Sequence, residues 1–192
     1  STIDQIVIAT SLEKRDAKII KLFKDTNIKV FKGSENDVLS RYIEAATQTD
    51  ADIIVRVTGD CPLIDPELVD DCVNKIIDSN LDYVSNCNNV GKPLPDGFDV
   101  EVFTINSLRS IQKISITSAY KEHVTFGYFK TNLFENDSIE YDQNYGHLRL
   151  TLDYEEDYIV ISKVYEAMKG KFWGWEEICE FLQDNKNIVK IN

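Results

Sequence analysis

The stretch "IIVRVTGDCPLIDPELVDDCV" (residues 53–73) decides how the chain is expected to fold. Its first part is rich in β-branched residues and ends at Thr-Gly-Asp, which is typical of a buried strand leaving a sheet. Asp-Pro-Glu then opens a segment with helical periodicity, and Pro66 suits the first turn of a helix. The stretch therefore predicts a strand–turn–helix unit with a carboxylate, Asp60, at the carboxyl end of the strand.

The same alternation continues on both sides of this unit. In the first half of the chain we expect strands at residues 3–9, 28–31, 52–58 and 81–85, and helices at residues 13–25, 37–48 and 66–78. Nearly continuous apolar strands that alternate with amphipathic helices predict an α/β fold, with a mostly parallel sheet and helices on both of its faces.

The second half is expected to be more elaborate. We expect strands at residues 100–104 and 147–152, and helices at residues 107–114, 119–130, 158–168 and 175–182. Residues 87–97 form a polar loop that contains two prolines and two glycines. No repeat, low-complexity segment or linker divides the chain, so a single domain over residues 1–192 is predicted.

Composition excludes several classes of protein. The net charge of −12 argues against a nucleic-acid backbone as partner, because phosphate binding needs clustered Lys and Arg. No apolar run approaches the length of about 20 residues that spans a membrane. The four cysteines form no CxxC pair and only two histidines are present, so we expect reduced thiols in a cytoplasmic protein rather than a zinc site. The sequence begins at Ser1 rather than Met, and we expect the native N-terminus to be missing.

Two carboxylates follow predicted strands, Asp60 after "VRVTG" and Asp153 after "HLRLTL". Ligands of open α/β sheets bind beyond the carboxyl ends of the strands. Two carboxylates that converge there would complete an Mg²⁺ site together with water and phosphate oxygens. The alternatives are a turn or cap role for Asp60, and for Asp153 a helix N-cap whose capping box is completed by Glu156.

Three further clusters are candidates for ligand contacts. In "PDGFDVEVF" (residues 95–103), strand alternation puts Asp99 and Glu101 on one face, which suits a polyhydroxylated or amino sugar or a solvated strand face equally. In "GSENDVLSRY" (residues 33–42), free N–H groups at a helix start could meet an anion or a base edge, although capping by Ser34 explains the serine as well. "KEHVT" (residues 121–125) contains His123 on a predicted helix, where a structural, hydrogen-bonded histidine is the alternative.

These segments occur together in a recognisable order. The ensemble resembles the cytidylyltransferase-like family of spore-coat polysaccharide biosynthesis protein F, which is similar to the acylneuraminate and 3-deoxy-manno-octulosonate cytidylyltransferases. The resemblance covers residues 3–192 and rests on six motifs, which are "FKGSENDVLSRY", "VRVTGDCPLIDPELVD", "DYVSN", "PDGFDVEVF", "EHVT" and "HLRLTLDYEEDY".

The resemblance implies a Rossmann-like nucleotide-diphospho-sugar transferase fold and an enzyme that joins a nucleoside triphosphate, most often CTP, to a sugar with release of pyrophosphate. It implies Asp60 and Asp153 as catalytic ligands of Mg²⁺, and a homodimer built by residues 87–104 and neighbouring segments. It places the nucleotide near Gly33, Ser34, Asp37 and Arg41, and the sugar near Asn86, Asp96, Asp99, Glu101, Glu122 and His123.

The chain also departs from the family pattern. It starts at what resembles the second strand, so the usual first strand and the triphosphate-binding loop Ala-Arg-x-x-Ser-x-Arg-Leu-Pro-x-Lys are absent. Phe126-Gly127 replaces a Pro-aromatic pair, and Tyr154-Glu155 replaces Thr-Pro. The leading hypothesis is a metal-dependent nucleotidyltransferase that acts on an acidic or amino sugar in surface-polysaccharide synthesis, with CTP as the expected nucleotide. The alternatives are a non-catalytic sugar- or nucleotide-binding relic, a subunit that borrows the loop, or a guanylyl- or uridylyltransferase on the same fold.

Overall fold

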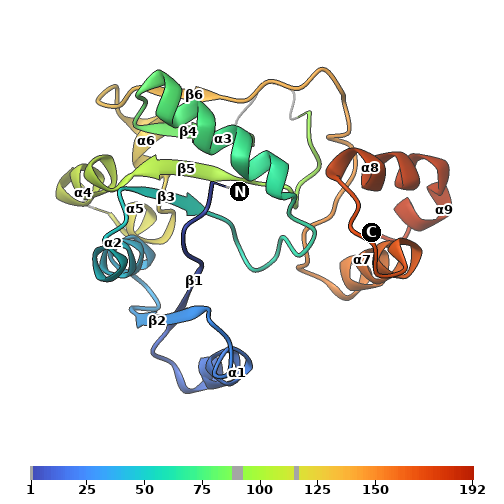
Figure 1. Cartoon of the computed structure of the whole chain (residues 1–192), viewed down its shortest axis with the longest axis horizontal. Helices are drawn as coiled ribbons and strands as arrows, with labels where there is room; N and C mark the ends of the chain where they lie inside the picture. Colours follow the sequence, from blue (N-terminus) through green and yellow to red (C-terminus); the bar gives the residue numbers. More distant parts are fainter. Residues whose placement is uncertain (1, 88–92, 115–116) are drawn as a thin grey trace.

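The computed structural model describes residues 2–87, 93–114 and 117–192, and part of the polar loop predicted at residues 87–97 therefore lies outside the described residues (Figure 1). The strands are β1 (Val7–Ser11), β2 (Lys29–Gly33), β3 (Ile53–Arg56), β4 (Tyr83–Ser85), β5 (Glu101–Thr104) and β6 (Asn136–Ser138). The helices are the short 3₁₀ helix η1 (Lys14–Asp16), α1 (Ala17–Leu22), α2 (Val38–Thr49), α3 (Pro66–Ser79), α4 (Ile105–Ile114), α5 (Ser118–Glu122), α6 (Phe126–Lys130), α7 (Glu155–Met168), α8 (Trp175–Asp184) and α9 (Lys186–Val189).

The strands form two sheets, which confirms the α/β class. β1 and β2 pair in parallel, and the larger sheet has the order β3-β5-β4-β6. β3 and β4 run in the same direction because helix α3 crosses over between them, whereas β5 is antiparallel to both. The chain reaches β5 from β4 without a described helix, so it can return in the opposite direction. The sheet is therefore mixed rather than mostly parallel.

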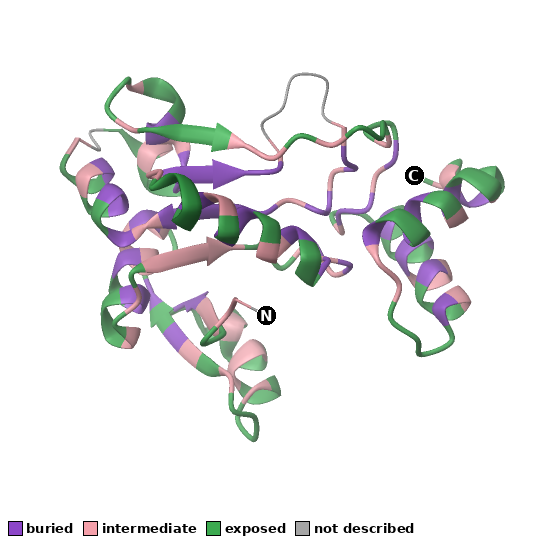
Figure 2. Ribbon diagram, turned by 45° about the horizontal axis from the view of Figure 1, so that its top comes forward, coloured by how far each residue is buried: buried purple, intermediate pink, exposed green. Residues whose placement is uncertain are grey.

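The main core lies on both faces of the β3-β5-β4 strands. Val84 and Val102 face a cluster that includes α3, α7 and α8, while their neighbours Tyr83 and Phe103 face a cluster formed with α2, α4 and α6. All four side chains are buried, as the alternation of side chains along a strand requires (Figure 2). Helices on both faces of the sheet were predicted, and the two clusters confirm them.

Several predicted elements were placed incorrectly. The first strand begins at Val7 rather than at residue 3, because its pairing with β2 begins at Val7 and the preceding residues 4–6 are exposed. The helix predicted at residues 13–25 is reduced to η1 and α1, and neither has a buried residue. Leu22, an apolar residue of α1, is 75% exposed, because α1 packs beside the two-stranded sheet at the edge of the molecule (Figure 1).

Two predictions in the second half also need correction. The helix predicted at residues 119–130 is interrupted between α5 and α6, and His123 ends α5 instead of lying within a helix. Residues 147–152 begin in a turn, and among the described residues they form a single isolated bridge, between Asp96 and Arg149. Leu150 donates a backbone hydrogen bond to the loop of Asp96 and Leu152 donates one to the loop of Asp60, so the segment does not pair with a single strand. β6 and α9 were not predicted at all.

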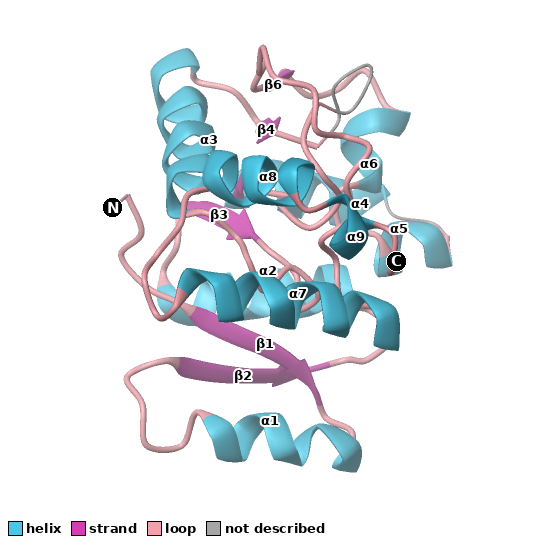
Figure 3. Cartoon of the chain, turned by 90° about the vertical axis from the view of Figure 1, so that its right-hand side faces the viewer, coloured by secondary structure: helices cyan, strands magenta, loops and turns pink. Residues whose placement is uncertain are grey.

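The β1–β2 pair lies on the β3 side of the larger sheet, and in the part of the chain that the structure describes the two sheets are not joined by strand pairing (Figures 1 and 3). Within the described residues, β1 pairs only with β2 and β3 only with β5, so each has one edge without a partner strand. The missing first strand stays a prediction, and this division of the sheet is compatible with it.

Residues 93–104, the described part of the polar loop and β5, contribute to the core of the chain. None of residues 93–104 is exposed, and Phe98, Val100 and Val102 are almost fully buried within the chain. The homodimer stays a prediction, and light scattering that shows a monomer at high concentration would contradict it. In residues 2–87, 93–114 and 117–192, the structure has no helix that is both long and apolar enough to cross a bilayer.

Candidate functional site

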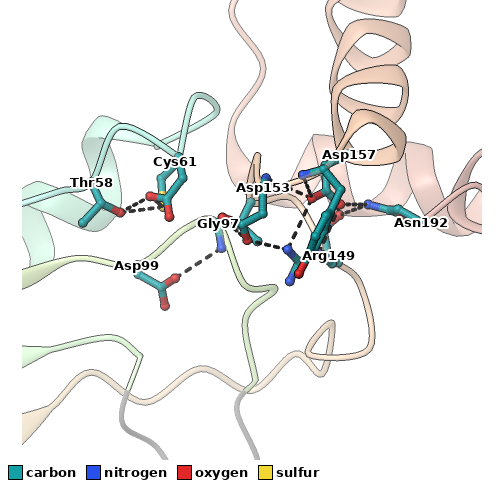
Figure 4. Close-up of polar contacts among 11 residues, drawn as sticks. Thr58, Cys61, Gly97, Asp99, Arg149, Asp153, Asp157 and Asn192 are labelled. Carbon is teal, nitrogen blue, oxygen red and sulfur yellow. Dashed lines mark hydrogen bonds and ion pairs between the residues drawn. The ribbon is translucent and has the colours of Figure 1, made fainter. Parts of the chain in front are cut away.

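Three backbone segments meet at the end of β3, and they bring the two predicted metal ligands onto neighbouring loops (Figure 4). The backbone N–H of Leu152 donates to the carbonyl oxygen of Asp60 over 2.8 Å. The N–H of Leu150 donates to the carbonyl oxygen of Asp96 over 2.7 Å. The segment that leads into Asp153 is therefore bonded directly to the loop of Asp60 and to the Pro-Asp-Gly turn.

Gly97 makes this close approach possible. Its φ is +115°, a backbone conformation that residues with a side chain rarely adopt. A Cβ atom there would lie 2.4 Å from the carbonyl carbon of Leu150, which no side chain can tolerate. The glycine of the "PDG" motif is thus required by the packing of the turn against the segment that carries Asp153.

Asp60 lies in a turn, with the N–H of Cys61 donating to the carbonyl oxygen of Thr58 over 3.1 Å. The Thr58 hydroxyl donates to Oδ1 of Asp60, which orients the half-buried carboxylate. Burial raises the pKa of the neighbouring Cys61 thiol to about 11, and the negative charges of Asp60 and Asp99 act in the same direction. Asp60, Cys61 and Asp99 therefore share one electrostatic environment.

Asp153 is 45% exposed and lies just before α7. Its Oδ2 accepts from the Arg149 guanidinium over 2.5 Å. The capping alternative is wrong, because the N-cap of α7 is Tyr154 and the carboxylate that accepts from the backbone N–H groups of Asp153 and Tyr154 is Asp157. The Asp153 carboxylate is thus not used by the helix.

Two predicted sugar ligands have structural partners within the fold. The buried Asn86 amide donates to the carbonyl oxygen of Phe98 and accepts from the N–H of Val100, both over 2.8 Å. The buried Glu101 carboxylate pairs with Arg56 and accepts from the Tyr83 hydroxyl over 2.8 Å. Sugar contacts by these two residues stay predictions, as they do for Asp96 and Asp99, which lie half-buried in and beside the turn next to Asp60.

The predicted nucleotide ligands gather where β2 leads into α2. Ser34 Oγ accepts from the N–H of Asp37 over 3.0 Å, and Arg41 donates to the carbonyl oxygen of Ser34 over 3.0 Å. Gly33 is needed here as well, since a Cβ atom would lie 2.9 Å from Cγ of Arg41. The N-cap of α2 is Asp37, whose carboxylate accepts from the N–H of Ser40 over 2.9 Å, so Ser34 closes the preceding turn instead of capping the helix. The nucleotide contact stays a prediction.

Glu122 and His123 lie on the α2 side of the molecule. Lys121 Nζ is 3.6 Å from a carboxylate oxygen of Asp37, and this ion pair ties α5 to the start of α2. Glu122 and His123 are both exposed. The predicted sugar ligands therefore divide into one group beside Asp60 and a second group beside the predicted nucleotide ligands.

The described residues contain no group of three or more His, Cys, Asp or Glu side chains arranged to hold a metal ion. A pair of carboxylates is nevertheless what Mg²⁺ usually takes from a protein, because it keeps several waters and borrows phosphate oxygens from the substrate. Asp60 and Asp153 on directly bonded loops fit that requirement. A cavity that includes Val7, Phe31 and Thr49 in its lining lies between the β1–β2 pair and α2, and none of its lining residues belongs to the predicted site.

Sequence reasoning missed Thr58, Arg149 and Asp157. Arg149 and Asp157 stand four residues before and four residues after Asp153, and their charges were visible in "HLRLTLDYEEDY". The contact between these charged residues was not predicted, because the sequence pattern put them on separate elements, a strand and a helix. Their contact depends on the turn at Asp153, which the sequence pattern does not specify.

Comparison with known proteins decides the family. The model of the cytidylyltransferase family matches residues 1–183. The chain belongs to the cytidylyltransferase family. By family, this cytidylyltransferase is therefore a nucleotidyltransferase, as the resemblance implied.

The relatives support the same assignment. The cytidylyltransferase is 35% identical to an uncharacterised protein of Methanocaldococcus jannaschii, over 99% of this chain and 77% of the relative. It is 33% identical to the spore coat polysaccharide biosynthesis protein SpsF of Bacillus subtilis, over 85% of this chain and 68% of the relative. The solved structure of a cytidylyltransferase from Leptospira borgpetersenii is similar with a TM-score of 0.89 and 30% identity, over 95% of this chain and 77% of that chain.

Proposed function

We propose that this protein is a metal-dependent cytidylyltransferase that activates an acidic or amino sugar for surface-polysaccharide synthesis. The observation that carries the proposal is the 2.8 Å hydrogen bond between Leu152 and Asp60, which places two candidate metal ligands on adjoining loops. The name of the Bacillus subtilis relative supports polysaccharide synthesis as the setting.

In the proposed reaction, a sugar hydroxyl oxygen forms a bond to the α-phosphorus of CTP, the bond to the leaving pyrophosphate breaks, and the hydroxyl proton passes to water. A bound Mg²⁺ supplies charge neutralisation at the phosphate oxygens. Asp60 and Asp153 hold the ion, and the Thr58 hydroxyl orients Asp60. Asp96 and Asp99, in and beside the adjoining turn, are positioned to accept hydrogen bonds from sugar hydroxyl or ammonium groups.

The proposed nucleotide site is the start of α2, with Gly33, Ser34, Asp37 and Arg41. Nε of Arg41 is buried and has no hydrogen-bond partner among the described residues, so it is a donor that a ligand could use. CTP is the expected nucleotide because the family is defined by cytidylyl transfer. Guanylyl or uridylyl transfer is the alternative that a nucleotide panel would reveal.

The substitution Asp60→Asn tests the proposal. Asn keeps the size of the side chain and its capacity to accept from Thr58, but it removes the charge that the metal needs. We expect pyrophosphate release with CTP, Mg²⁺ and a panel of acidic and amino sugars to fall by roughly 100-fold or more, with an unchanged melting temperature. EDTA should abolish release by the wild-type protein.

Near-normal turnover of Asp60→Asn would mean that the carboxylate serves only the turn. The matched control is Asp137→Asn, which removes a carboxylate paired with Lys75 on the surface and should leave the rate unchanged.

The second candidate is a relic, or a subunit that borrows its triphosphate-binding loop from a partner. The unpaired edges of β1 and β3 favour the idea that another strand belongs to this sheet. The coding DNA upstream of Ser1 distinguishes this second candidate from an enzyme that is complete in one chain. An in-frame segment of the type Ala-Arg-x-x-Ser-x-Arg-Leu-Pro-x-Lys supports an enzyme complete in one chain, and its absence supports the relic or the borrowing subunit.

A further inference from the structure

A polar network surrounds Asp153 and includes residues that the proposed metal site does not use (Figure 4). Its centre is Asp157, which lies in the first turn of α7. Asp157 is only 1% exposed. Arg149 reaches it from the preceding extended segment, and Asn192 reaches it from the region after α9. The network thus joins three parts of the chain around one buried carboxylate.

Asp157 fixes the backbone on which Asp153 is carried. Its Oδ2 accepts from the backbone N–H groups of Asp153 and Tyr154, each over 3.0 Å. Its Oδ1 accepts from the Arg149 Nε over 3.1 Å and from the Asn192 amide over 3.0 Å. Burial alone would raise the pKa of Asp157, but these hydrogen bonds outweigh it and hold the pKa well below its usual range. Asp157 is therefore an ionised carboxylate with a full set of donors.

Arg149 has a different role, because it contacts the side chain of Asp153 rather than its backbone. Nη2 lies 2.5 Å from Oδ2 of Asp153 and 3.3 Å from Oδ2 of Asp157. One guanidinium therefore balances two carboxylates, and part of its charge lies beside the oxygen that a metal ion would approach. A metal ion and a guanidinium at the same oxygen would repel each other, so only one can hold it fully.

We propose that Asp157 is the positioning residue of the metal site and that Arg149 is a counter-ion that the metal must displace from Asp153. This inference rests on the proposed function, since it assumes that Asp153 binds the metal. Displacement leaves Arg149 attached to Asp157 through Nε, so the network keeps its centre. The two residues then have opposite effects on metal affinity, which makes their roles separable.

Titration of the whole purified chain with Mn²⁺ alone, followed by the electron paramagnetic resonance signal of free Mn²⁺, measures this affinity without an activity assay. Arg149→Met removes the competing charge while the backbone bonds to Asp157 remain, and we expect Mn²⁺ to bind roughly 3- to 10-fold more tightly. Arg149→Lys keeps the charge and should have a Mn²⁺ affinity close to that of the wild-type protein. Asp157→Asn frees the loop and should weaken binding roughly 10-fold or more.

Two controls separate the failure of this inference from the failure of the proposed function. Asp137→Asn removes a remote surface carboxylate and should bind as the wild-type protein does. Asp153→Asn should lose the site. If it binds Mn²⁺ normally, the metal site itself is wrong.

If Asp153→Asn loses the site but Arg149→Met binds no more tightly than the wild-type protein, Arg149 is not a competing counter-ion and this inference is overturned. The same holds if Arg149→Lys gains as much affinity as Arg149→Met. Should Asp157→Asn fail to fold in a thermal melt, Asn192→Ala removes a single donor to Asp157 and should weaken Mn²⁺ binding by a smaller factor. Unchanged Mn²⁺ binding in a folded Asp157→Asn would overturn the positioning role, and unchanged binding in Asn192→Ala would do so if Asp157→Asn does not fold.

Discussion

Glu101 has 6% of its surface exposed, and both of its carboxylate oxygens have partners, Arg56 and the Tyr83 hydroxyl. The sequence groups it with Asp99 in an acidic cluster, but strand alternation could not show that an arginine from β3 would neutralise it. That pairing depends on the register in which Arg56 lies opposite Glu101. A carboxylate predicted for sugar binding therefore has a structural partner that only the sheet topology reveals.

Glu101→Gln tests which role dominates. The substitution leaves the partly buried Arg56 without its counter-charge, and we expect the free energy of unfolding to fall by about 2–3 kcal/mol in urea denaturation. Asp137→Asn breaks an exposed ion pair with Lys75 and should cost less than about 1 kcal/mol. A Glu101→Gln protein with wild-type stability and a raised KM for the sugar would instead support the ligand role.

At the scale of the elements, the sequence predicted those with strong periodicity and a partner on one face. The helix predicted at residues 66–78 is α3, and its N-cap Asp65 accepts from the N–H of Glu67 over 2.8 Å. The helix predicted at residues 13–25 is shorter in the structure, where η1 and α1 have no buried residue and so cover no part of the core. The segment at residues 147–152 has the composition of a strand, but it bonds to two different loops, and such a choice of partners is not encoded in local pattern.

The turn at Gly97 is the element that joins these loops, and Gly97→Ala tests its importance. Positive φ and the 2.4 Å approach to Leu150 should together lower the free energy of unfolding by at least about 3 kcal/mol. Gly59→Ala is the matched control, because its Cβ would meet no atom within 4 Å, and it should change stability by no more than about 1 kcal/mol. Equal melting temperatures of the two variants would show that the turn can relax without cost.

At the scale of the whole molecule, the α/β class could be predicted from the alternation of apolar strands with amphipathic helices, and the family and enzyme class from six short motifs in order. The sheet order could not, because it depends on β5 inserting antiparallel between β3 and β4 and on the division between β1 and β3. Of the candidate site, the two candidate metal ligands, Asp60 and Asp153, were expected at strand ends, and they lie on directly bonded loops. The network that holds Asp153 was hidden because its members lie on a loop, a helix and the segment after α9.

The central claim is that Asp60 and Asp153 together hold the catalytic metal. The most direct measurement is anomalous diffraction from a crystal of this protein soaked in Mn²⁺, which takes the oxygen ligands of Mg²⁺ and can be located by its scattering. The proposed site predicts one strong peak within roughly 2.5 Å of a carboxylate oxygen of each residue, with waters completing the coordination. A Mn²⁺ peak on other carboxylates, or no peak near Asp60 and Asp153 at saturating Mn²⁺, would contradict it.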